Sequence, residues 1–149
     1  MPYTQQHKEY DPIIGSLPSD EGFISMLDKY RPTGGIANPA ELVQRQPGGK
    51  KPDINALAKL ILVGEIFSFE WQGKFWIPLF QFKANELTGR HCVRQVLGEL
   101  TNVFDGWTLA VWFVQANAWL ENKKPIDLLD SGLSSVLHAA RADRYVALG

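Results

Sequence analysis

Histidine and cysteine, the side chains that most often provide nucleophiles, proton carriers and zinc ligands, are few in this sequence. The three histidines are His7, His91 and His138, and His91 alone has a suggestive neighbour, the single cysteine Cys92. A structural zinc site needs four ligands at workable spacings, and Cys92 falls beside the apolar stripe of a predicted helix, where packing is the favoured role. Gly-rich phosphate loops, nucleophile elbows and HExxH motifs do not occur. We therefore predict a protein that is not an enzyme and needs no metal or cofactor.

Basic side chains between residues 45 and 74 offer a second chemistry, contact with nucleic-acid phosphates. Four basic residues against one acid give residues 45–59 a local net charge of +3, and one further lysine is expected at the tip of a hairpin. Lysine contacts phosphate as a point charge, and asparagine can contact the edge of an adenine. The predicted DNA contacts are Lys50, Lys51, Asn55, Lys59 and Lys74. The alternative is a purely structural module, because few side chains of this stretch are able to distinguish bases.

The elements that would position these residues follow a recognisable order. Apolar residues at helical spacing predict helices over residues 19–31, 38–46 and 53–62, the second introduced by NPAE, which is typical of a helix start. Alternating aromatic residues over 65–83, interrupted by Gln72-Gly73, then predict a β-hairpin. This is the order of a winged helix-turn-helix, in which the third helix would enter a major groove and the hairpin would follow the backbone.

The second half of the chain is predicted to be helical. One apolar stripe covers residues 91–104, and a second helix over 106–120 is apolar nearly all round, so we expect it to be central and buried. Pro125 opens a short turn of helix, and Ser131 is the expected N-cap of the last helix.

Bulk composition places the chain among ordinary globular proteins. It has 149 residues, is 45% hydrophobic and carries a net charge of −1, so no overall field attracts nucleic acid or a membrane. One cysteine forbids an internal disulfide, and no apolar run is long enough for a membrane span, so we predict a cytoplasmic protein. The predicted class is mainly α with a β-hairpin (α+β). The predicted division is an irregular arm (1–18), a winged-helix-like module (19–83) and a helical bundle (84–149).

Residues 112–149, WFVQANAWLENKKPIDLLDSGLSSVLHAARADRYVALG, contain the most specific pattern of the sequence. An aromatic-rich helix leads to Asn, Leu, a basic turn, a Pro-x-Asp-Leu-Leu corner and a final helix. This stretch resembles the Xre/MbcA/ParS-type toxin-binding domain of bacterial antitoxins. The matching residues are Trp112, Asn117, Leu120, Lys124, Pro125, Asp127, Leu128, Leu129, Val136, Ala140, Arg141 and Tyr145.

The chain departs from the pattern of that family in three places. Glu121-Asn122 occupies the site after the Leu where such domains usually have Gly. The N-terminal half does not look like an Xre-type helix-turn-helix, and four residues follow Tyr145, which is short for a mechanism that needs a long C-terminal plug.

The resemblance implies a non-catalytic antitoxin that neutralises a protein toxin, such as a RES-type toxin that consumes NAD, by covering its active site. It also implies a homodimer and binding to promoter DNA. The predicted partner contacts are Lys123, Lys124, Asp127, Arg141, Arg144 and Tyr145. No membrane partner is expected.

Local chemistry alone also allows a structural role for the same residues. Asn117 would bond free carbonyls at the end of a long helix, and Lys123 and Lys124 would complement its negative end. Two further functions remain open: a stand-alone DNA-binding regulator whose C-terminal half dimerises, and a structural adaptor whose aromatic hairpin is the docking edge.

Overall fold

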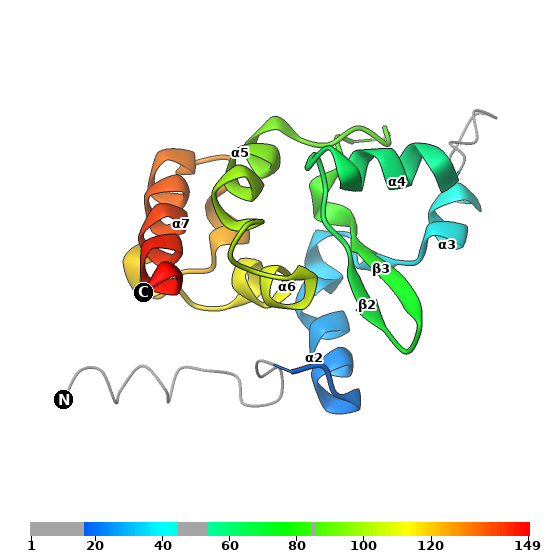
Figure 1. Ribbon diagram of the computed structural model, residues 1–149, viewed down its shortest axis with the longest axis horizontal. Helices are drawn as coiled ribbons and strands as arrows, with labels where there is room; N and C mark the ends of the chain where they lie inside the picture. The colour runs from blue at the N-terminus through cyan, green and yellow to red at the C-terminus, as the bar shows by residue number, and fades with distance from the viewer. Residues whose placement is uncertain (1–16, 45–53, 85) are drawn as a thin grey trace.

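The computed structural model describes residues 17–44, 54–84 and 86–149 (Figure 1). The helices are α2 (Asp20–Tyr30), α3 (Pro39–Gln44), α4 (Ile54–Leu62), α5 (His91–Leu100), α6 (Gly106–Val114) and α7 (Leu133–Leu148). The strands are β1 (Ile36–Ala37), β2 (Phe69–Trp71) and β3 (Lys74–Pro78), and the 3-10 turns are η1 (Arg31–Thr33), η2 (Leu79–Gln81), η3 (Ala118–Leu120) and η4 (Pro125–Leu128). The chain is mainly helical with a small antiparallel sheet, which confirms the predicted α+β class. Within these ranges no helix is both long and apolar enough to cross a bilayer.

Side-chain caps start the first helices where the sequence predicts them. The Ser19 hydroxyl oxygen accepts a hydrogen bond from the Gly22 N–H at 3.0 Å. The Asn38 side-chain oxygen accepts from the Glu41 N–H at 2.9 Å, and the Glu41 carboxylate accepts from the Asn38 N–H at 3.3 Å. This reciprocal capping box satisfies two backbone donors that a helix start otherwise leaves unpaired, and so it positions α3.

The sheet contains the predicted hairpin and one strand that was not predicted. The strand order is β1-β3-β2, with both pairs antiparallel, and Trp71 is paired with Lys74 across the turn. Gln72 and Gly73 both have positive φ, as a two-residue hairpin turn of the favoured twist requires. Pro78 lies at the end of the central strand, where its missing N–H costs least.

The larger apolar core draws on both predicted halves of the chain. Met26 and Tyr30 of α2 are buried in the same cluster as Phe113 of α6 and Val96 of α5. The buried Tyr30 hydroxyl donates a hydrogen bond to the Ala110 carbonyl at 2.6 Å, and burial raises the pKa of Tyr30 well above its ordinary value. Residues from both sides of the predicted boundary at 83 and 84 therefore contribute to one apolar cluster.

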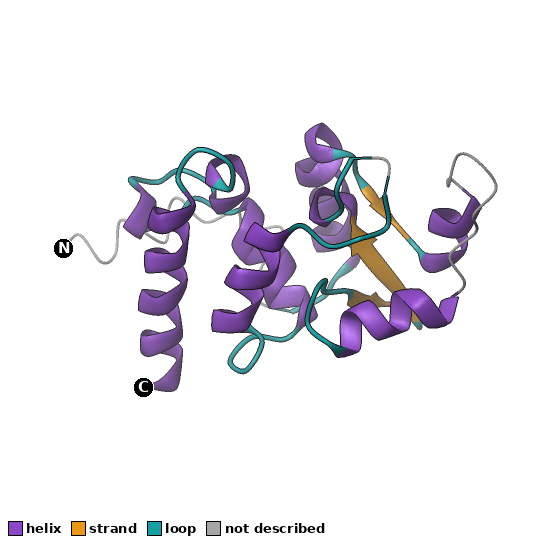
Figure 2. Ribbon diagram, turned by 90° about the horizontal axis from the view of Figure 1, so that it is seen from above, coloured by secondary structure: helices purple, strands orange, loops and turns teal. Residues whose placement is uncertain are grey.

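A second, smaller cluster lies where α3 and α4 pack on the sheet. Its buried residues are Ala37, Leu42, Leu57, Ile66 and Ile77. The sequence predicted a helix with one apolar face over residues 53–62, and of the residues of α4 only Leu57 is fully buried. Figure 2 shows the strands toward one end of the molecule and α7 at the other.

Helix α6 is the buried centre that its composition predicts. All residues from Leu109 to Val114 are buried, and the Asp105 carboxylate caps the helix by accepting from the Thr108 N–H at 2.8 Å. The predicted end of this helix at residue 120 is wrong. The helix stops at Val114 because Gln115 is extended and the next turn is organised by the side chain of Asn117 instead.

Gln81 is a buried polar residue that the sequence did not single out. It is fully buried, and its amide donates to the carbonyls of Phe67 at 2.9 Å and Pro78 at 3.0 Å while accepting from the Phe67 N–H at 2.7 Å. The side chain thereby supplies the partners that this part of the backbone does not find in a strand.

Candidate protein-binding surface

The corner, defined as residues 117–129, begins with a closed loop rather than with the end of a long helix. The Asn117 N–H donates to the Lys123 carbonyl at 3.0 Å, and the Asn122 N–H donates to the Asn117 carbonyl at 2.9 Å. The Asn117 side-chain oxygen accepts from the Trp119 N–H at 2.9 Å. The expectation that Asn117 bonds free helix carbonyls is wrong, because its amide NH2, the group that could donate to a carbonyl, donates to the Asp143 carboxylate at 3.0 Å.

Two residues of this loop have backbone conformations that favour glycine. Glu121 has φ of 56° and Asn122 has φ of 63°. The left-handed region costs a residue with a Cβ about 1–2 kcal/mol. These are the positions where the chain lacks the Gly expected from the antitoxin-like pattern, so we expect the departure to lower the stability of the loop.

One carboxylate ties the corner to α7. Asp143 accepts from the Trp112 indole N–H at 2.8 Å and the Asn117 amide at 3.0 Å through one oxygen, and from the Trp119 indole N–H at 3.1 Å through the other. Hydrogen bonds to an ionised acceptor are among the stronger ones in proteins. The last helix therefore fixes the orientation of two tryptophans that precede it in the chain.

Trp119 is exposed although it is held in place. Its side chain is 53% exposed, and the edge of its ring meets His138 with ring centroids 6.4 Å apart. The sequence prediction missed this residue, because Trp119 was assigned to a helix that the structure ends earlier. Tyr145, Val146 and Leu148, near the end of α7, are also exposed, and we group them with Trp119 under the name C-terminal surface.

The two predicted arginines share a carboxylate of α5. Arg141 Nε lies 3.1 Å from Glu99 Oε2, and Arg144 Nη1 lies 3.6 Å from Glu99 Oε1. Their side chains remain 62% and 44% exposed, so a screened pair of this kind is weak and exchangeable. Tyr145 follows directly and is 79% exposed.

The basic turn and Asp127 are placed separately from these arginines. Lys123 and Asp127 are exposed, and Lys124 is half-buried as the residue that precedes the buried Pro125. Within the described residues none of the three charged side chains forms an ion pair. They remain predicted partner contacts, on the corner rather than on α7.

The predicted DNA contacts are described only in part. Lys50 and Lys51 lie outside the described residues, and so do residues 1–16 of the predicted N-terminal arm. Asn55 and Lys59 are exposed on α4, and Lys74 is exposed where the hairpin turns. DNA contact by these residues remains a prediction.

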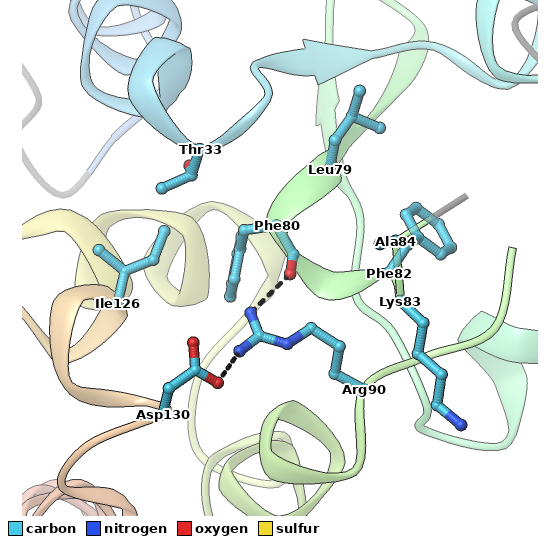
Figure 3. Close-up of a pocket in the computed structure, with 9 residues that line it drawn as sticks. All are labelled: Thr33, Leu79, Phe80, Phe82, Lys83, Ala84, Arg90, Ile126 and Asp130. Carbon is cyan, nitrogen blue, oxygen red and sulfur yellow. Dashed lines mark hydrogen bonds and ion pairs between the residues drawn. The ribbon is translucent and has the colours of Figure 1, made fainter. Parts of the chain in front are cut away.

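A shallow hollow of about 570 Å³ lies where the corner meets the first half of the chain (Figure 3). Arg90 crosses it, donating to the Phe80 carbonyl at 3.0 Å and pairing with the Asp130 carboxylate at 2.6 Å. Its other lining residues are Thr33, Leu79, Phe82, Lys83, Ala84 and Ile126. The lining contains no nucleophile paired with a base. We therefore interpret the hollow as a gap between two packed parts of the chain and not as an active site. In the described ranges no three His, Cys, Asp or Glu side chains are grouped to hold a metal ion.

No protein-family model matches the sequence, and comparisons with curated proteins and with solved structures find no match. The features that bear on function are therefore the residue pattern of 112–149 and the geometry of the C-terminal surface.

Proposed function

We propose that this protein is a non-catalytic, antitoxin-like protein whose C-terminal surface binds a partner protein and neutralises it. The observation that carries the proposal is Trp119, an exposed indole fixed by Asp143 and by its own backbone bond to Asn117. Tryptophan, tyrosine and arginine dominate interface energies, and a side chain ordered before binding loses little further entropy. Trp119 and Tyr145 would be the anchors, with Arg141 and Arg144 at the rim.

The class of partner follows from the resemblance of residues 112–149. It is a toxin, such as a RES-type enzyme that consumes NAD, and neutralisation is steric: the C-terminal surface and the corner cover the toxin active site. Arg141 and Arg144 support this, since exposed side chains paired with Glu99 can exchange that partner for acidic groups of the toxin. Lys123, Lys124 and Asp127 would contact the same partner from the corner. We propose that this protein binds the toxin in the cytoplasm.

The experiment is a tagged pull-down of the full chain from its native cell, followed by a titration and an activity assay of the recovered partner. Trp119→Ala and the double variant Arg141→Ala/Arg144→Ala are compared with Phe75→Ala, an equally exposed aromatic on the hairpin. We expect Trp119→Ala to weaken binding by about thirtyfold, roughly 2 kcal/mol, and to release the partner's NAD consumption from inhibition. Phe75→Ala should bind as the wild type does. Equal binding by all variants would refute the surface, and recovery of DNA alone would refute the antitoxin role.

Promoter binding is the second part of the proposal, and the order α2, α3, α4, β2, β3 supports it. That order matches a winged helix-turn-helix, with Lys74 at the turn of the hairpin. Affinity for the chain's own promoter should fall steeply with salt and should decrease in Lys74→Ala, because phosphate contacts release counterions. Binding that does not change with salt would exclude this arrangement.

A further inference from the structure

The hollow of Figure 3 combines an apolar wall with the end of one arginine side chain. Its volume of about 570 Å³ lies within the range of about 300–1,000 Å³ that is usual for sites of small molecules. Four apolar side chains, each buried or half-buried, line it: Leu79, Phe80, Phe82 and Ile126. Figure 3 shows the guanidinium of Arg90 reaching between Phe80 and the corner. The lining is therefore suited to a ligand that is apolar in one part and anionic in another.

The guanidinium of Arg90 uses only part of its hydrogen-bonding capacity. A guanidinium has five N–H donors, and among the described residues this one donates to two acceptors, the Phe80 carbonyl and the Asp130 carboxylate. The contact with Asp130 joins one nitrogen to one oxygen, whereas the favoured geometry of an arginine and a carboxylate has two parallel bonds. The Arg90 side chain is 24% exposed, so a ligand in the hollow can reach the other donors.

Asp130 is a weakly held partner for this arginine. Its side chain is 90% exposed, and an ion pair with so exposed a member contributes little to stability. A carboxylate from a ligand can therefore replace that of Asp130 at small cost. Lys83, which also lines the hollow, forms no ion pair within the described part of the chain. Two cations, Arg90 and Lys83, against the one carboxylate of Asp130 give the lining a net charge of +1, which is complementary to a single carboxylate.

We propose that the hollow binds a small organic acid, a carboxylate attached to an aromatic or branched apolar body, and that this carboxylate displaces Asp130 from Arg90. The ligand carboxylate forms a bidentate pair with the guanidinium, which keeps its bond to the Phe80 carbonyl. The apolar body lies against Leu79, Phe80 and Ile126. This inference does not depend on the proposed function, because the hollow and the C-terminal surface share no residue.

NMR titration of the full chain with 4-phenylbutyrate tests the site. We expect the backbone amide signals of Thr33, Leu79, Arg90 and Ile126 to shift and to saturate, with a Kd on the order of millimolar for an acid of this size. 4-Phenylbutyramide has the same apolar body without the charge and should bind about tenfold more weakly. Acetate has the charge without the body and should also bind more weakly. The proposal is overturned if the amide or acetate binds as well as the acid, or if these four signals do not shift.

Asp130→Asn gives a test that a folding defect cannot imitate, because it predicts a gain. The exchange removes the carboxylate that competes for Arg90, so 4-phenylbutyrate should bind about fivefold more tightly. Asp127→Asn is the matched control, since Asp127 is an exposed carboxylate of the corner that does not line the hollow. It should bind as the wild type does. Unchanged or weaker binding by Asp130→Asn overturns the displacement.

Arg90→Gln tests the other member of the pair. We expect it to lose at least about tenfold in affinity for 4-phenylbutyrate, because the bidentate charged contact is removed. Arg94→Gln is its control: Arg94 lies on α5, pairs with Glu65 and does not line the hollow. The dispersion of the amide signals in the same spectra shows that each variant is folded. Equal affinity of Arg90→Gln and Arg94→Gln would contradict a site built on Arg90.

Discussion

Glu121 shows at the scale of one residue how this chain differs from the antitoxin-like pattern. Because its φ of 56° is unfavourable for any residue with a Cβ, Glu121→Gly should relieve strain. Glycine also makes the unfolded chain more flexible, so we expect a net gain of about 0.5–1 kcal/mol in the free energy of unfolding. Urea denaturation followed by circular dichroism measures it. The same exchange at Glu21, in the first turn of α2, should destabilise instead, and a loss of stability at residue 121 would contradict the strained loop.

Asp143 is a residue whose removal should separate the corner from α7. Asp143→Asn retains one oxygen but turns an amide NH2 toward at least one of the three N–H donors from Trp112, Asn117 and Trp119. We expect a loss of about 1–3 kcal/mol in stability. Quenching of tryptophan fluorescence by acrylamide should increase as Trp119 is released.

Asp127→Asn is the control for that exchange, because Asp127 is exposed and unpaired within the described residues. It should change stability by no more than about 0.5 kcal/mol. If the two variants behave alike, Asp143 does not organise the corner.

At the scale of elements, the contact of α6 with β2 and the segment before it depends on Gly106. A Cβ at this position would lie 2.0 Å from the Ser68 carbonyl oxygen, so Gly106→Ala must move a buried helix or the backbone ahead of β2. We expect a loss of about 2–3 kcal/mol. Gly98, in the last turn of α5, has nothing within 4 Å of its added Cβ, and Gly98→Ala should gain about 0.5–1 kcal/mol. Thermal unfolding of the two variants should therefore shift in opposite directions, and a shift in the same direction would contradict the close approach.

The elements that the sequence predicts well are those with their own start and stop signals. The capping box at Asn38 and Glu41 and the two-residue hairpin turn are local, and both are observed. The end of α6 was mispredicted because apolar spacing continues to Leu120, while competition from the Asn117 side chain is visible only in three dimensions. Strand β1 has two residues and depends on pairing with β3, so no local sequence pattern predicts it.

At the scale of the whole molecule, the sequence predicts which residue types the candidate site contains. It does not predict which of these residues are in contact. Exposure of Tyr145 is consistent with its place beyond the apolar stripe of the last helix. Pairing of Arg141 with Glu99 joins residues 42 positions apart, and the hydrogen bonds to Asp143 join residues 24 to 31 positions apart. Spacing along one helix cannot predict such contacts.

Tyr30 gives a test of the shared core, since its hydroxyl connects α2 to α6 through the Ala110 carbonyl. Burial raises the pKa of Tyr30 in the folded state, so the folded chain keeps this proton at a pH where the unfolded chain loses it. The stability linked to this group is therefore complete below about pH 10, the ordinary tyrosine pKa, and decreases as the pH rises from there toward the folded-state value.

Tyr30→Phe should lose about 1 kcal/mol near neutral pH through the missing hydrogen bond, but it should be less sensitive to alkali. Urea denaturation of both proteins at about pH 7 and about pH 11 makes the comparison, with the exposed Tyr145→Phe as control. If the wild type and Tyr30→Phe lose the same stability between the two pH values, Tyr30 has the same pKa in the folded and unfolded chain. Tyr30 would then not be buried between α2 and α6.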